Sequence, residues 1–208
     1  METGTSRQDR ITKALGTGII AGCLAAIVLD LASVWLSDRL GMFRHTISNL
    51  AASERRTVID DISDAGLYAF AAAVLATAYG LGHWRAERRD WQVGRLALVV
   101  VAACVALIAG YEAYTQDYGP MIHYKLVYAL GIAFPLAVLL TAGHFGTLDR
   151  RLGRAFFAGG VLWAAAAPFL FVVATGSDGI YERVLATLML AWFIAVGVLI
   201  RRGPRALG

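Results

Sequence analysis

The sequence has little cysteine and lacks two common hydrolase motifs. Its 208 residues contain only Cys23 and Cys104, both within apolar runs, so we expect neither a disulfide framework nor a cysteine-based zinc site. The absence of an H-E-x-x-H spacing and of a G-x-S-x-G elbow excludes the usual forms of the metalloprotease and α/β-hydrolase sites. The first apolar run is too long for a signal peptide and has no clear cleavage site, so we expect a retained helix.

Long apolar stretches make up most of the chain, in which 58% of the residues are hydrophobic. A membrane helix needs about 20 mostly apolar residues, and alternating strands are excluded because these runs are continuous. The sequence therefore predicts an all-α polytopic integral membrane protein, one domain over residues 1–208. Its six predicted transmembrane helices cover residues 11–36, 59–82, 93–114, 120–141, 155–175 and 180–200.

Basic residues predict the orientation of these helices. If the N-terminus is cytoplasmic, 13 of the 19 Lys and Arg residues lie on the cytoplasmic side, and the positive-inside rule then places both termini there. The net charge of +4 is explained by cytoplasmic arginines, which set the topology and attract anionic lipid headgroups. We therefore expect membrane lipids and no nucleic acid as partners. Abundant arginine and alanine indicate a bacterial source, hence a multi-pass protein of the bacterial cytoplasmic membrane.

Asp30 is the most informative single residue, because it lies inside the first predicted helix. A carboxylate at this depth costs a few kcal/mol on insertion scales, so we expect Asp30 to face the bundle interior or a wet cavity and to have a partner. Ser33 and Ser37 follow it on the same face. The alternative is a packing contact in which Asp30 is protonated or hydrogen-bonded, without a role in function.

The first predicted outer loop, residues 44–51, is dense in donors and acceptors. Ile47 and Leu50 interrupt its polar residues, which indicates a segment that folds back onto the helices. Turn or cap roles explain part of the same pattern equally well. The candidate ligand-binding residues of this loop are Arg44, His45, Ser48 and Asn49.

Further polar residues lie at the predicted outer ends of the other helices. Asp64 continues a polar stripe into the membrane, whereas Lys125 can snorkel to the interface and Glu182 can satisfy a helix dipole. Polar residues from different segments lie at a similar depth in the membrane. We therefore expect them to converge in one outward-facing pocket. The residues of this predicted cluster are Asp30, His45, Ser48, Asp64, Glu112, His123 and Glu182.

Three short segments carry a family resemblance. The run 45–51 after the first helix, the region of His123 and the run 179–183 resemble the domain of unknown function 998 family of six-helix bacterial and archaeal membrane proteins. The resemblance spans nearly the whole chain and implies the six-helix architecture. It gives weight to five residues, Ser48, Asn49, His123, Glu182 and Arg183, and implies no particular reaction.

The first functional hypothesis is an outward-facing pocket that binds or moves a lipid headgroup or small polar molecule. In this hypothesis three basic residues, Arg44, Lys125 and Arg183, hold an anionic group. Three acidic residues pair with them: Asp30, Asp64 and Glu182.

The alternatives are an enzymatic function, a redox function, or a purely structural or accessory role. An intramembrane hydrolase or lipid-modifying enzyme would bind zinc through His45, Asp64 and His123, with Ser48 or Glu182 assisting a water in the fourth position. Haem would need His45 and His123 on one side and His83 and His144 on the other. These histidines lie at helix ends rather than within the span, so we do not expect haem.

Overall fold

The computed structural model describes residues 3–37, 42–43, 46–47, 57–84, 87–110, 119–173 and 176–203. Within this part of the chain every regular element is helical, and six helices are long and apolar enough to cross a membrane. The predicted all-α, six-helix architecture is confirmed. The elements are α1 (Thr3–Leu36), α3 (Val58–Gly82), α4 (Arg89–Gly110), α5 (Gly119–Leu148), α6 (Arg150–Ala166), the 3₁₀ helix η1 (Ala167–Phe171) and α7 (Asp178–Arg202).

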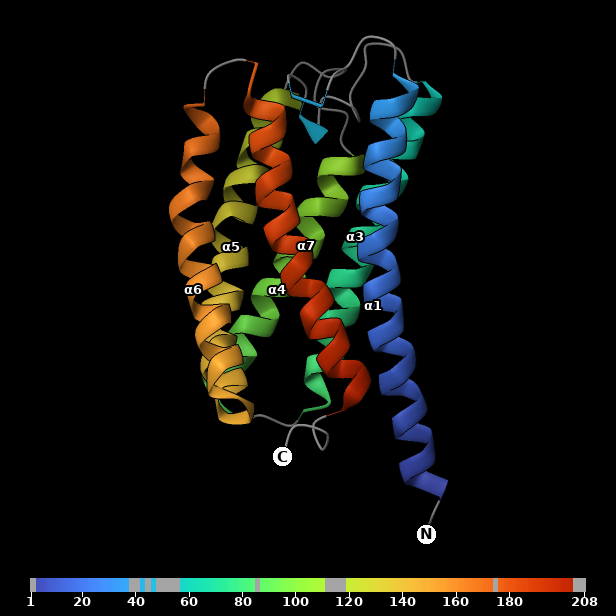
Figure 1. The fold of residues 1–208 in the computed structure, drawn as a ribbon, viewed down its shortest axis with the longest axis vertical. Helices are drawn as coiled ribbons and strands as arrows, with labels where there is room; N and C mark the ends of the chain where they lie inside the picture. The colour runs from blue at the N-terminus through green and yellow to red at the C-terminus, as the bar shows by residue number, and fades with distance from the viewer. Residues whose placement is uncertain are drawn as a thin grey trace.

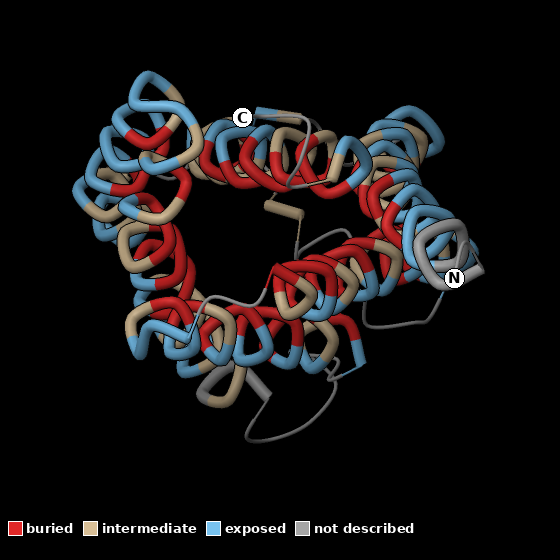
Figure 2. Tube along the Cα trace, turned by 90° about the horizontal axis from the view of Figure 1, so that it is seen from below, coloured by how far each residue is buried: buried red, intermediate tan, exposed pale blue. Residues whose placement is uncertain are grey.

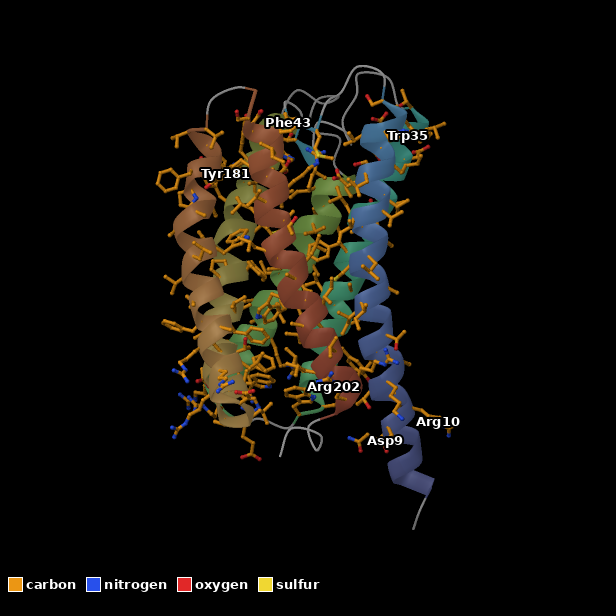
Figure 3. All side chains as sticks on the ribbon, viewed as in Figure 1. Asp9, Arg10, Trp35, Phe43, Tyr181 and Arg202 are labelled. Carbon is orange, nitrogen blue, oxygen red and sulfur yellow. The ribbon has the colours of Figure 1, made fainter. Side chains whose placement is uncertain are left out.

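The helices run side by side and form a ring when viewed along the bundle (Figures 1 and 2). Helices that follow one another from α1 to α6 pack as neighbours, and α7 returns to lie against α1. We call the end where α1 begins and α7 ends the proximal end, and the opposite end the distal end. Figure 3 places Asp9, Arg10 and Arg202 toward the proximal end and Trp35, Phe43 and Tyr181 toward the distal end.

Local sequence signals explain several helix boundaries. Thr57 and Asp60 form a capping box at the start of α3. Asp149 caps α6 by accepting hydrogen bonds from the backbone N–H groups of Arg151 and Leu152, which allows a sharp turn after α5. Because these caps satisfy donors at the helix starts, they fix where each helix enters the bundle.

The fifth apolar run differs from the single helix predicted over residues 155–175. The α-helix ends at Ala166 and a 3₁₀ turn follows. Pro168 causes this break, because it has no N–H to donate to the carbonyl four residues earlier and disfavours helical geometry in the residue before it. The break lies toward the distal end, where it borders the cavity described below.

The direction of the bundle in the membrane stays a prediction, and cysteine labelling tests it. In a background lacking Cys23 and Cys104, cysteines at positions 88 and 150 are expected to react with an impermeant thiol reagent only after permeabilisation of the cells. Cysteines at positions 48 and 178 are expected to react in intact cells, because the positive-inside rule leaves the less basic side outside. The reverse labelling pattern would contradict the predicted orientation.

Candidate functional site in the distal half of the bundle

An ion pair joins the first and last helices. Asp30 lies about 9 Å along α1 from its end at Leu36, and Arg183 about 7 Å from the start of α7. The guanidinium donates through Nε to Asp30 Oδ2 at 2.9 Å and through Nη2 to Asp30 Oδ1 at 3.0 Å. The side chains are only 17% and 9% exposed, so the prediction that Asp30 is partnered inside the bundle is confirmed.

Arg183 also holds the segment that follows α1. Its Nη1 donates to the carbonyl oxygens of Met42 at 3.0 Å and Gly179 at 3.2 Å. Nearby, the backbone N–H of Ile180 donates to the carbonyl of Phe43, and that of Ile47 donates to the Glu182 carboxylate. The described parts of this segment therefore fold back onto α7, as its apolar residues predicted.

A cavity of about 650 Å³ lies beside this ion pair. Residues from α1, α3, α4, α5, α6, η1 and α7 line it, together with Met42 and Ile47. Among the described residues, the acidic and basic side chains that contribute to the lining are Asp30, His123, Glu182 and Arg183. His123 Nδ1 is buried and has no hydrogen-bond partner among the described residues.

The remaining walls of the cavity are mostly apolar. Trp163 is held in the wall by a hydrogen bond from its Nε1 to the Leu185 carbonyl, at 3.0 Å. Tyr128 stacks on Phe171, with their ring centroids 4.5 Å apart. The result is an apolar cavity with a small group of ionisable side chains, rather than a uniformly polar pocket.

Only part of the predicted cluster surrounds the cavity. Asp30, His123 and Glu182 line it, whereas Asp64 is buried elsewhere on α3. Lys125 is exposed on α5 and does not belong to the lining, although it was expected to hold an anionic group. The other predicted site residues lie outside the described residues: Arg44, His45, Ser48, Asn49 and Glu112.

The described residues do not assemble the predicted metal site. They contain no group of three or more His, Cys, Asp or Glu side chains placed to hold a metal ion. Of the predicted zinc ligands, His123 lines the cavity and Asp64 does not, while His45 falls outside the described part of the chain. Zinc binding therefore stays a prediction from the sequence.

The two histidines considered for a haem near the proximal end have aromatic neighbours. The ring of His83 lies edge-on to Tyr79, at 4.8 Å between centroids, and the ring of His144 lies 4.2 Å from Trp91. Trp84 contacts both Trp91 and Phe145 in the same region. These contacts form an aromatic cluster that joins the α3–α4 and α5–α6 hairpins.

The apolar walls are the part of the site that the sequence did not predict. Phe70, Trp163 and Met189 are buried members of the lining. In a transmembrane helix, apolar residues face lipid as well as the interior, so their positions give no clear pattern. The helix break at Pro168 was the available signal, since irregular backbone at membrane depth occurs beside protein or a cavity.

Comparison with known families agrees with this architecture. No curated protein and no solved structure matches the chain. A family described as "Protein of unknown function (DUF998)" matches residues 19–199, which include Asp30, Arg183 and nearly all of the helical bundle. This match covers most of the sequence and agrees with the resemblance noted from the short segments. The chain is therefore a six-helix integral membrane protein that belongs to the DUF998 family.

Proposed function

We propose that the protein binds a single-chain amphiphile in the distal cavity. The observation that carries this proposal is the combination of mostly apolar walls with a few ionisable groups, Asp30, Glu182, Arg183 and His123. An alkyl chain would lie against the apolar walls and the polar head would lie near the ionisable groups. Pockets for small molecules commonly have this composition, an apolar lining with a few placed polar groups.

The size of the cavity supports the same ligand class. Its volume of about 650 Å³ lies within the range of about 300–1,000 Å³ that is typical of small-molecule sites. Several lining residues remain accessible, including Ile132 at 69% and Val184 at 52% exposure. Because these residues lie in membrane-spanning helices, we propose that a ligand enters the cavity from the bilayer.

The membrane setting favours an amphiphile over a fully polar solute. A polar molecule would lose its hydration against the apolar walls without gaining enough hydrogen bonds in return. An alkyl chain already in the bilayer does not pay this cost, and the ionisable groups can fix its head. We therefore propose lipid binding or lipid transfer as the function, with the polar groups setting head-group selectivity.

Filling the cavity tests the proposal. Gly131 lines the cavity, and a Cβ added there has no neighbouring atom within 4 Å, so Gly131→Phe is expected to place its ring in the ligand volume. Native mass spectrometry of protein purified in mild detergent is expected to show a bound amphiphile on the wild type. The affinity for this amphiphile is expected to fall about tenfold or more in Gly131→Phe, because the ring takes the volume of the alkyl chain; tenfold in Kd corresponds to about 1.4 kcal/mol. At subsaturating amphiphile the occupancy falls accordingly.

Gly143→Phe is the matched control. Gly143 lies on the same helix, an added Cβ there also meets open space, and the residue does not line the cavity. Its amphiphile occupancy is expected to equal that of the wild type. Equal occupancy in all three proteins would show that the bound molecules lie on the outer surface of the bundle, and would contradict the proposal.

A further inference from the structure

The hydrogen bonds of Arg183 restrict the head group that the cavity can take. The guanidinium uses nearly all its N–H donors, on both Asp30 oxygens and on the carbonyls of Met42 and Gly179. Asp30 also balances its charge at close range. A phosphate or carboxylate head would have to displace Asp30 and leave that carboxylate buried without its partner, which is costly inside a membrane.

The other polar groups around the cavity supply acceptors. The Glu182 carboxylate accepts from the Ile47 N–H, and a carboxylate has capacity for further donors. Pro135 lies in α5 four residues after Gly131 and has no N–H, so the Gly131 carbonyl lacks its regular helical donor. The Thr187 hydroxyl already donates to the Arg183 carbonyl.

The charges of the described lining residues also disfavour a negatively charged head group. Asp30 and Arg183 cancel each other, which leaves the Glu182 carboxylate as the remaining acid. Of the described lining residues, only Arg183 and His123 can carry positive charge, and Arg183 is engaged as described above. The charges of the described ionisable lining residues therefore sum to neutral or negative, unless His123 is protonated.

We infer that the amphiphile has a hydrogen-bond-donating head without negative charge, an amine or a hydroxyl, that donates to Glu182. This inference rests on the proposed function and specifies its ligand class. It differs from the sequence-based expectation that Arg44, Lys125 and Arg183 hold an anionic group, because Asp30 occupies Arg183.

Three probes that share one alkyl chain and differ in their head group test this inference: dodecylamine, dodecanol and dodecyl phosphate. Each is added to the full-length protein in the same detergent, and the midpoint of thermal unfolding is measured. All three are added at the same concentration, about ten times the Kd of the amine or the alcohol. These two are expected to raise the midpoint by about 3–6 °C, whereas dodecyl phosphate is expected to have little effect. Gly131→Phe is expected to abolish these shifts.

Glu182→Gln separates the two permitted head groups. Loss of the carboxylate charge is expected to lower the affinity for dodecylamine about tenfold and that for dodecanol less than about threefold, because hydrogen bonds to charged groups are the stronger ones. Asp178→Asn is the control, since Asp178 lies in the first turn of the same helix but does not line the cavity. It is expected to leave both affinities unchanged.

The outcomes distinguish failure of the inference from failure of the proposed function. If dodecyl phosphate shifts the midpoint as much as the amine and the alcohol do, and Gly131→Phe abolishes that shift, the cavity binds amphiphiles but the inference about the head group is wrong. If Gly131→Phe changes no shift for any of the three probes, the proposed function itself is wrong. Equal amine affinity in Glu182→Gln and the wild type would exclude Glu182 as the acceptor.

Discussion

Arg183→Met is expected to destabilise the protein by about 3–5 kcal/mol, the usual cost of removing one partner of a buried ion pair. The substitution leaves the Asp30 carboxylate without its two guanidinium hydrogen bonds, in a side chain that is only 17% exposed. It also removes the donor to the Met42 and Gly179 carbonyls. Reversible unfolding in mixed micelles measures the change.

The double variant Asp30→Leu/Arg183→Met provides the control for this prediction. Replacing both charges with apolar side chains removes the cost of an isolated buried charge, so most of the lost stability is expected to return. Equal stability of the wild type and the Arg183→Met single variant would show that the ion pair does not hold α1 against α7. The role assigned to Arg183 in positioning the cavity would then be wrong.

Gly153→Ala is expected to destabilise the protein by about 1–3 kcal/mol, the usual cost of overpacking. A Cβ at Gly153 would lie 2.6 Å from the backbone nitrogen of Gly146 and 2.9 Å from the carbonyl oxygen of Ala142. Both contacts are with backbone, so α5 and α6 must move apart to admit the methyl group. Close approach of helices at small residues is a usual packing mode in membranes.

Gly159→Ala on the same helix is the matched control. Its added Cβ meets open space, so the substitution is expected to be neutral or to stabilise the helix slightly through the better helix propensity of alanine. Unfolding midpoints of the two variants, measured in the same detergent, check the difference. Equal midpoints would contradict the close contact between α5 and α6.

Much of the fold could be predicted because lipid imposes a strong constraint on sequence. Continuous apolar runs of sufficient length predicted all six membrane helices, and the cost of a buried carboxylate predicted that Asp30 has a partner. The break in the fifth run was missed. Its composition stays apolar on both sides of Pro168, so hydropathy alone gives no sign of a boundary there.

The site was harder to predict than the fold. Asp30 was expected to pair with one of three basic residues that included Arg183. Which of them it would pair with could not be predicted, because the two residues come from opposite ends of the sequence and no local spacing indicates the pair. Asp64 was grouped with the cluster because of similar membrane depth, which does not fix the direction of a side chain. Lys125 was expected to hold an anionic group, but it does not line the cavity. Apart from Pro168, the apolar walls carried no signal, because residues such as Phe70 and Met189 suit lipid and protein interior alike.

The most direct test of amphiphile binding is an experimental structure of the protein purified from native membranes and reconstituted in nanodiscs. We expect elongated density in the distal cavity, with its chain between Phe70, Trp163 and Met189 and its head within hydrogen-bond distance of Glu182. The Asp30–Arg183 pair is expected to remain intact beside it. A cavity closed by its own side chains, or an anionic head bound to Arg183 in place of Asp30, would contradict this account of the site.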